Sequence, residues 1–465
     1  MRGKTETFDI LSCATRAAKK CGLEAHVVWH AYREATMRSA CGQVHQTPEA
    51  DAGILNVLVR DGLRAACISV AECSPSRVRG AVKQASLLLP EVPENPFLPE
   101  LLVQPEEFPE KTLGLDTYAG FPVDTQVKER AFRRIYQASQ GSTLLGSARF
   151  FTAGCEIGVA NTVGLARYHT ASYSFLSLVV TGSNGLSSYA DRASSLPSGV
   201  DVEGAIEEAF SRAALAQRLP FVDPFVDGKG ARTYDGVFSH YAIGEWMYWV
   251  SMFTFNGLAV LEEQSYLSGR KPGEKVTGSD FSIQDDWQHQ DVIALPFDLE
   301  GATRRQLPLI EKGIYRAVPY DGMTAKKAGT VSTGHSVLAP WGTIPMCLVV
   351  EGNSATFEDL VAQSAKPTIV GTYFNYPGMP DPREAVFTAT TRHGTFLVED
   401  GAYKAVCPPL RVRMRSFDAL SRIEGMTPSR LIRGQENYGM FYPVSLVVPA
   451  MRIRDVDFVG SNPSI

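Results

Sequence analysis

The first half of the chain alternates between helical and extended hydrophobic patterns. Apolar residues at helical spacing predict a first helix from about Thr5 to Lys20, which Gly22 ends. The segment EAHVVWHAY alternates apolar and polar residues as a strand does. AGILNVLVRDGLRAACISV alternates on both sides of Asp61-Gly62, which is typical of a hairpin. The pattern therefore predicts a strand-rich sheet with flanking helices.

Three later segments have the period of amphipathic helices. SPSRVRGAVKQASLLL begins with Ser74 or Ser76 as its cap and has a proline in its first turn. DTQVKERAFRRIYQASQ follows with Asp124 as its cap, and VEGAIEEAFSRAALAQ is the third. The proline-rich residues 89–100 predict a linker or long loop, because proline removes a donor and fixes φ. Residues 145–183 predict further strands.

A different pattern begins near residue 225. After a helix that starts near His240, the chain contains mostly short strands separated by Gly, Pro and Asp turns. With 465 residues the chain is also too long for one ordinary core. We therefore expect an α+β protein, with an N-terminal α/β domain at 1–225 and a β-rich C-terminal domain at 226–465.

Charge and composition exclude some classes of partner. The net charge is −5 and the pI is near 6.0, so no overall basic field attracts nucleic acid or anionic lipid. In LRVRMRSF, Arg411, Arg413 and Arg415 alternate, and we favour a solvated strand face over a site for an acidic ligand. The longest apolar run, 246–261, is shorter than a membrane span and predicts a buried helix.

The cysteines and the N-terminal segment point to one compartment. The eight cysteines contain no CxxC pair and no compact framework, which predicts reduced thiols and no Cys-rich structural zinc site. The N-terminal segment lacks the apolar core and cleavage site of a secretory signal. We therefore expect a cytoplasmic protein. GxxxxGK[ST], a strand-linked GxGxxG, GxSxG and HExxH do not occur, which leaves the common nucleotide-binding, serine-hydrolase and zincin motifs without support.

Several stretches together resemble the TldD/PmbA family, a group described as metallopeptidases or as modulators of DNA gyrase. The clearest runs from Leu295 to His335, with an Asp-x-Glu-Gly turn, a strand ending in I-x-x-G and an A-x-x-x-G helix before Thr-Gly. RHGTFLVEDGAYKAVCPP resembles a family hairpin, and GILNVLVRDGLRAACIS and EIGVANTVGLARYHTASYSFLSLVV fit as well. The resemblance implies an N-terminal α/β domain, a barrel-like C-terminal domain and a dimer that encloses a cavity.

The resemblance also gives meaning to FSHYAIGEWMYW. In the TldD branch a helix carries HExxxH and a cysteine near the C-terminus completes the zinc site, whereas the PmbA or TldE branch lacks these ligands. Here HYAIGE keeps His240, places Tyr241 at the position of the general base and places Glu245 at that of the second histidine. The C-terminal segment has no cysteine, and Gln435 or Glu436 lies nearest that position. The metal candidates are thus His240, Glu245 and Glu436, with Tyr241 as the catalytic candidate.

Two interpretations of this segment remain. A zinc hydrolase needs three protein ligands, a water position and a base, and a phenol is a poor base at neutral pH. Residues five apart on a regular helix also diverge by about 140°, unless Gly244 permits a distortion. In the structural alternative, Ser239 caps the helix, His240 lies in its first turn and Glu245 pairs with a cation. We favour the structural alternative.

Other residues are weaker candidates. A cluster of four acids suits acid/base chemistry or cation binding, although we favour a structural role for it: Asp285, Asp286, Asp298 and Glu300. His335 follows Thr-Gly and lines the expected cavity or forms a satisfied loop histidine. Trp246, in the aromatic run WMYWVSMFTF, lines the cavity or packs in the core.

These features lead to a functional expectation with two alternatives. We expect a PmbA/TldE-like subunit of a TldD/PmbA-type metallopeptidase, involved in proteolysis or peptide maturation, with a degenerate zinc site. Its partners would be a TldD-like subunit or a second copy in a homodimer, together with a peptide substrate. A zinc ion, where the complex holds one, would belong mainly to the partner subunit. The alternatives are an autonomous metalloenzyme with altered ligands that acts on a peptide-like metabolite, and a non-enzymatic assembly module.

Overall fold

The computed structural model describes residues 1–40, 42–103, 125–226, 232–337, 343–434 and 443–461. Within these ranges the chain forms an α+β fold with three β-sheets, as the sequence predicted. None of the helices described is both long and apolar enough to cross a membrane.

The first sheet is antiparallel throughout and has the order β4-β3-β1-β5-β6-β7, with β2 paired to β1. Its strands are β1 (Glu24–Ala40), β2 (Gln43–Gln46), β3 (Glu49–Asp61), β4 (Arg64–Val70), β5 (Leu144–Asn161), β6 (Ala166–Gly182) and β7 (Ser187–Ser194). The predicted hairpin is confirmed, because Asp61 pairs with Arg64. Gly62 lies between them with a φ of 56°, a left-handed conformation that glycine adopts without strain.

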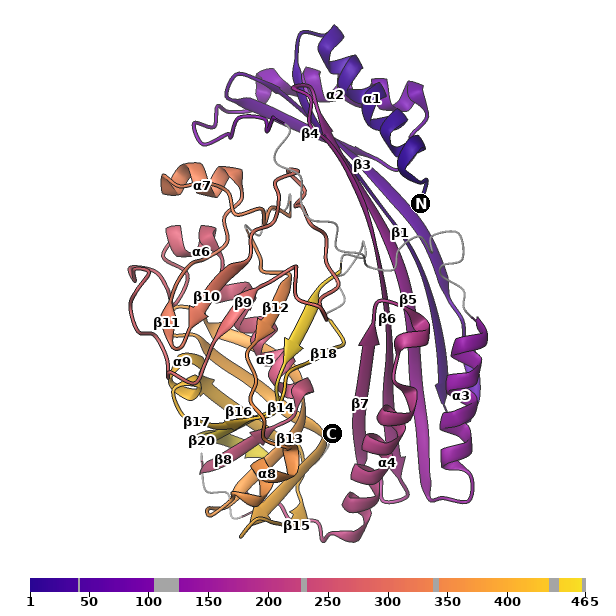
Figure 1. The fold of residues 1–465 in the computed structure, drawn as a ribbon, viewed down its shortest axis with the longest axis vertical. Coiled ribbons are helices and arrows are strands. Elements are labelled where there is room, and N and C mark those ends of the chain that lie inside the picture. Colours follow the sequence, from indigo (N-terminus) through magenta and orange to yellow (C-terminus); the bar gives the residue numbers. More distant parts are fainter. Residues whose placement is uncertain (41, 104–124, 227–231, 338–342, 435–442, 462–465) are drawn as a thin grey trace.

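Helices lie at both ends of this sheet (Figure 1). They are α1 (Lys4–Lys20), α2 (Pro75–Leu88), the 3-10 turn η1 (Leu89–Glu91), α3 (Thr125–Ser139), the 3-10 turn η3 (Pro197–Gly199) and α4 (Val202–Arg218). Ser74 is the N-cap residue of α2, and Pro75 occupies its first turn. Asp201 caps α4 by accepting a hydrogen bond from the Gly204 amide at 2.9 Å. Asp124, the predicted cap of α3, lies outside the described residues.

The middle of the first sheet is buried on both faces. Ile157 and Val159 of β5 pack with Trp287 and Leu295 from the C-terminal half. Gly158 points the other way, and a Cβ there would lie 2.4 Å from a methyl group of Thr7 in α1. The long strands therefore join the N-terminal helices on one side to the C-terminal half on the other.

The second sheet contains a closed barrel, which confirms the barrel-like C-terminal expectation. Its strands are β8 (Arg232–Phe238), β13 (Thr368–Asp381), β14 (Val386–Glu399), β15 (Ala402–Val406), β16 (Leu410–Arg415), β17 (Ile423–Met426) and β20 (Met451–Ser461). The order β13-β8-β20-β16-β14 is closed by pairing of β14 with β13, which makes five strands in the ring. On β16, Arg411, Arg413 and Arg415 are exposed and the residues between them are buried, so the predicted solvated face is confirmed.

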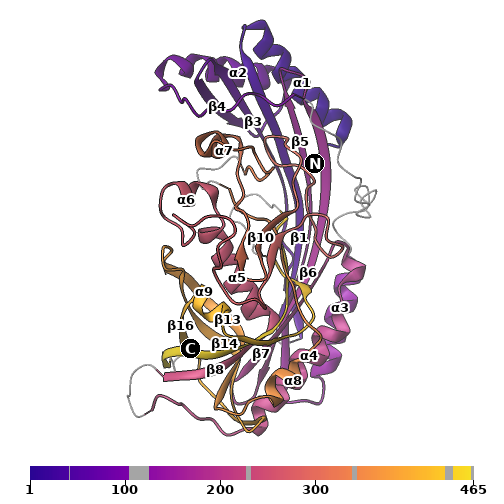
Figure 2. The same cartoon turned by 60° about the vertical axis from the view of Figure 1, so that its left-hand side comes forward.

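A third sheet and a buried helix lie beside the barrel (Figure 2). The strands are β9 (Ile283–Asp285), β10 (Leu307–Glu311), β11 (Ile314–Tyr315), β12 (Cys347–Val350), β18 (Arg430–Ile432) and β19 (Ser445–Val448). The helices of this half are α5 (His240–Thr254), α6 (Gly257–Leu261), α7 (Gly322–Ala328), α8 (Phe357–Ala362) and α9 (Ser416–Leu420). The apolar run 246–261 does not form the single helix that was predicted. It divides between the C-terminal part of α5, which ends at Thr254, and α6, because the Asn256 side chain caps a new helix. Helix α5 packs against β13 of the barrel and β19 of the third sheet. The domain boundary near residue 225 stays a prediction.

Candidate functional site

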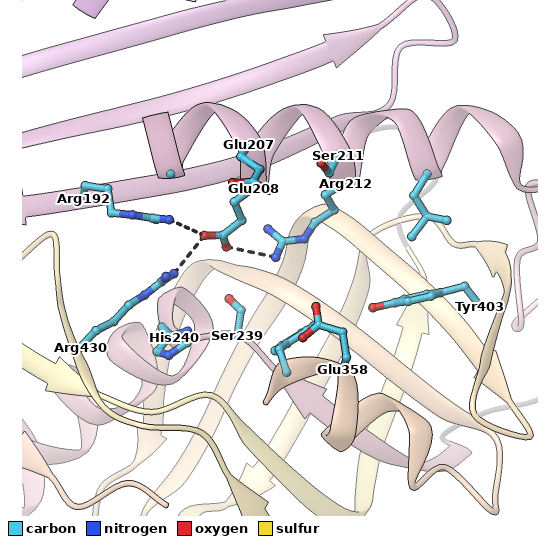
Figure 3. A pocket seen from close by; sticks show the side chains of 13 residues that line it. Arg192, Glu207, Glu208, Ser211, Arg212, Ser239, His240, Glu358, Tyr403 and Arg430 are labelled. Carbon is cyan, nitrogen blue, oxygen red and sulfur yellow. Dashed lines mark hydrogen bonds and ion pairs between the residues drawn. The ribbon is translucent and has the colours of Figure 1, made fainter. Parts of the chain in front are cut away.

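A pocket of about 540 Å³ lies where α4 of the N-terminal half meets the start of α5 (Figure 3). Its lining residues are Arg192, Gly204, Glu207, Glu208, Ser211, Arg212, Leu215, Ser239, His240, Phe357, Glu358, Tyr403 and Arg430. They come from β7, α4, α5, α8, β15 and β18, so segments from both halves of the chain build the pocket.

Three arginines converge on one carboxylate at this pocket. Glu208 Oε1 lies 3.1 Å from Arg212, and Glu208 Oε2 lies 3.0 Å from Arg192 and 3.2 Å from Arg430. The Glu208 side chain is 21% exposed, so these charges are only partly screened by water. Figure 3 shows the carboxylate between the three guanidinium groups. The cluster ties α4 to β7 on one side and to β18 on the other.

The hydroxyl group of Tyr241 belongs to the same cluster. It donates to Glu208 Oε2 at 3.1 Å and accepts from Arg430 at 2.8 Å and from Arg192 at 3.1 Å. Burial raises the pKa of this phenol, and the Glu208 carboxylate adds to the rise while Arg430 opposes it. The residue that the resemblance places at the general-base position is therefore a neutral phenol whose hydroxyl group bonds to three side chains.

The arginines have the opposite effect on the pKa of Glu208. Burial by itself would raise the pKa of this carboxyl, but Arg212, Arg430 and Arg192 hold it well below its usual range. Glu208 is consequently ionised at neutral pH, where it serves as the common counter-ion of the three arginines.

His240 lies in the first turn of α5 and lines the pocket. Ser239 caps the helix by accepting a hydrogen bond from the Tyr241 amide at 3.2 Å, as the structural alternative expected. The Nε2 atom of His240 lies 3.1 Å from the Thr427 hydroxyl and 3.3 Å from the Pro428 carbonyl oxygen. Burial and the nearby Arg430 lower the pKa of His240 to about 3, so the imidazole is neutral at pH 7.

Glu245 makes its contacts in a different direction. It accepts a hydrogen bond from Tyr373 at 2.9 Å, and it forms an ion pair with Arg433 at 4.0 Å. The helix between His240 and Glu245 is regular, so Gly244 does not distort it. A Cβ at Gly244 would lie 2.1 Å from the side chain of Ile432, so this glycine allows β18 to approach α5 closely.

In the part of the chain that the structure describes, the candidate ligands do not fit a zinc ion. His240 and Glu245 bond to separate partners, and cationic guanidinium groups lie beside both of them. No group of three or more His, Cys, Asp or Glu side chains in the described ranges is placed to hold a metal. Glu436, the third predicted ligand, and the nearby Gln435 lie outside the described residues.

The acids of the family-like stretch form structural contacts elsewhere. Asp298 accepts backbone hydrogen bonds from Glu300, Ala302 and Ser336, which defines the Asp-x-Glu-Gly turn. Glu300 accepts from the Gly322 amide at the start of α7 at 2.9 Å. Burial and the neighbouring Asp298 raise the pKa of Glu300 to about 8. The geometry around the turn is that of a folded loop held by its carboxylates.

The remaining candidates lie away from this pocket. His335 is fully buried, and its Nε2 atom lies 3.4 Å from Asp285 Oδ1. Asp285 also accepts from the Met346 and Cys347 amides, while Asp286 accepts from the Gln288 amide and the Gln306 side chain. Trp246 is fully buried, donates its indole N–H to Ser416 at 3.0 Å and packs against Phe387. The cavity role proposed for His335 and Trp246 stays a prediction.

Sequence reasoning found His240 and Tyr241 but missed the residues around them. Glu208 and Arg212 are four residues apart on α4, a spacing that signals an intrahelical ion pair. The same spacing is common on ordinary solvent-exposed helix faces, so it does not identify Glu208 and Arg212 as part of a site. Arg192 and Arg430 lie far from α4 in the sequence, so only the fold brings them to Glu208.

Comparisons with known proteins find one matching family model and several solved structures of similar fold. A family model described as the PmbA/TldA metallopeptidase C-terminal domain matches residues 231–460. TldE from Thermococcus kodakarensis has a similar fold at 17% identity, with a TM-score of 0.82 and coverage of 97% of this chain and 99% of that one. No curated protein is significantly similar in sequence.

Two further solved structures have the same fold, and both proteins are described as modulators of DNA gyrase. The one from Thermotoga maritima is 17% identical, with a TM-score of 0.80 and coverage of 97% of this chain and 100% of that one. The one from Bacteroides thetaiotaomicron is 17% identical, with a TM-score of 0.79 and coverage of 98% and 99%. At this identity the structures show a common fold and nothing finer.

Proposed function

This chain belongs to the TldD/PmbA family, and from that premise we propose that it is a PmbA/TldE-like, non-catalytic subunit of a TldD/PmbA-type peptidase. The peptide would be cleaved or matured at a zinc site held mainly by a TldD-like partner in the cytoplasm. This chain would complete the chamber and help to hold the peptide.

The observation that carries the proposal is the state of Tyr241. General-base catalysis needs a group that can accept a proton near the working pH, and such help is worth about 10² to 10⁴ in rate. Tyr241 instead has a raised pKa, and its hydroxyl is already bonded to Glu208, Arg192 and Arg430. His240 and Glu245 add support, because the two residues bond to different partners.

The test combines this chain with a homologous partner that carries an intact HExxxH. Cleavage of an unstructured peptide is measured for four samples: wild type and Tyr241→Phe, each with and without the partner. Co-purification of the two chains is recorded in parallel.

We expect co-purification, no turnover by either form of the lone chain, and turnover by both pairs, because the chemistry lies in the partner. Robust turnover by the lone wild-type chain that Tyr241→Phe abolishes would overturn the proposal in favour of an autonomous enzyme. Failure of the two chains to associate would overturn the subunit role.

A further inference from the structure

We propose that the pocket between α4 and α5 binds a carboxylate group of a short peptide, with Arg430 as its principal contact. This proposal rests on the proposed function, because it names the chemical group by which this subunit would hold the peptide. The proposal follows from the charge, the unused donors and the lining of the pocket.

Cationic groups gather around Glu208 at one end of the pocket. Arg192, Arg212 and Arg430 all contact Glu208. Arg192 also pairs with Asp201 at 3.3 Å, and Glu207 is a further acid of the lining. In Figure 3, Arg192 and Arg430 lie at one end of the pocket and Glu358 and Tyr403 lie at the other. A ligand with one anionic end matches this distribution, whereas a polyanion such as a nucleic acid would meet Glu358.

Arg430 has a donor that the described part of the chain leaves unused. One terminal nitrogen donates to Glu208 and to Tyr241, at 3.2 and 2.8 Å. The other terminal nitrogen, Nη1, makes no hydrogen bond to the described residues and is not among the buried unpartnered atoms. It can therefore donate to a ligand oxygen in the pocket. The Nε atom is buried, so a ligand does not reach it.

A carboxylate is the oxygen-bearing group that best matches these features. Its two oxygens accept charge-assisted hydrogen bonds from the planar fork of a guanidinium group. The side chain of Arg430 is 31% exposed, so a ligand can reach it without displacing Glu208. The guanidinium carbon of Arg430 lies 5.3 Å from the centroid of the Tyr241 ring, which holds the side chain in place. Because Arg430 is already ordered, binding of a ligand costs less conformational entropy.

The rest of the lining suits the residues that precede such a carboxylate. Leu215, Phe357 and Tyr403 contribute apolar surface, and the 540 Å³ volume lies in the range of small-ligand sites. Glu358 at the far end is exposed and suits a cationic group, such as the amino end of a tripeptide. The carboxylate itself comes from a C-terminus or from an acidic side chain, and these two sources are distinguishable.

The experiment measures binding to the purified full chain by titration calorimetry. The probes are the tripeptide Ala-Leu-Ala, its C-terminal amide, and acetyl-Ala-Glu-Ala-amide. We expect Ala-Leu-Ala to bind at least about tenfold more tightly than its amide, which corresponds to about 1.4 kcal/mol. Tighter binding of the glutamate peptide than of either alanine-leucine probe would assign the carboxylate to a side chain and still support the proposal.

Two variants locate the effect. Arg430→Gln is expected to reduce binding of the acid tripeptide to the level of the amide. Arg411→Gln, on the exposed face of β16, is the matched control and is expected to leave all affinities unchanged. Equal affinity of the wild-type chain for all three probes, or no binding of any probe at millimolar concentration, would overturn the proposal.

Two further readouts keep the outcomes separate. Thermal unfolding shows whether the Arg430→Gln variant is folded. If the variant is unfolded, the comparison of the three probes on the wild-type chain still shows whether the pocket selects a carboxylate. Association with a TldD-like partner is measured independently. Association without carboxylate selectivity rejects the peptide pocket alone, whereas selectivity without association rejects the subunit role alone.

Discussion

The hydroxyl group of Tyr241 lies 3.1 Å from a carboxylate oxygen of Glu208, which joins α5 in the C-terminal half to α4 in the N-terminal half. The same two residues share Arg192 and Arg430. The residue that the family resemblance places at the general-base position is therefore, in this chain, a fixed point between two parts of the fold.

Removal of the Glu208 charge is expected to destabilise the fold strongly. Glu208→Gln leaves three guanidinium groups without their common counter-ion. Breaking a fully buried ion pair costs about 3–5 kcal/mol. Because Glu208 is partly exposed, we expect the free energy of unfolding to fall by about 2–3 kcal/mol. Urea unfolding at pH 7 measures the loss. Glu207→Gln, at an exposed neighbouring position, is the matched control and should change the free energy of unfolding by less than about 0.5 kcal/mol.

The Glu208 effect should also depend on pH in a defined direction. Because the folded-state pKa is depressed, the stabilisation is fully present above the unfolded pKa of about 4.3 and is lost as the pH falls toward the folded-state value. The difference between wild type and Glu208→Gln should therefore shrink below about pH 4. A difference that is constant from pH 7 to pH 3 would contradict the assigned ion pairs.

His240 is expected to make the chain less stable as the pH falls below 6.5. Its folded-state pKa is about 3, so the unfolded chain binds the extra proton first and the free energy of unfolding decreases. Between pH 7 and pH 5 the decrease attributable to His240 should be about 2 kcal/mol. His240→Gln should flatten this dependence, whereas His45→Gln, at an exposed site, should leave it unchanged.

Glu300 is expected to show the opposite dependence. Its folded-state pKa is about 8, so its protonated form is favoured in the fold and stability is lost as the pH rises from the unfolded value toward 8. Glu300→Gln keeps an acceptor for the Gly322 amide and should be more stable than wild type at pH 8 but similar at pH 4. Glu399→Gln is the exposed control. Equal stability of the Glu300 variant and wild type at both pH values would refute a raised pKa.

The purified chain is expected to retain little zinc. The side-chain atoms of His240 and Glu245 that could bind a metal already bond to separate partners, and arginines lie beside both residues. Elemental analysis after dialysis against a mild chelator measures the metal content. About one equivalent per chain that disappears in His240→Ala or Glu245→Ala would show instead that these residues ligate a metal.

The helices and strands follow largely from local patterns. The hairpin at Asp61-Gly62 and the helix that begins at His240 lie where hydrophobic period, glycine and capping signals place them. Ser239 caps its helix through contacts between neighbouring residues, and such contacts are encoded within a few positions of the chain. The alternation of Arg411, Arg413 and Arg415 likewise defines a strand face without further information.

The amino-acid sequence by itself determined the elements, the α+β class and the loss of the HExxxH ligands, because each depends on residue types at short spacing. Only the tertiary structure decided what Tyr241 does, because Glu208, Arg192 and Arg430 come from three separate elements. Gly244 shows the same division: the sequence left open whether this glycine permits a distorted helix, whereas the close approach of Ile432 explains it in the folded chain. Electrostatic environments arise from distances between residues remote in sequence, and the folded chain alone sets those distances.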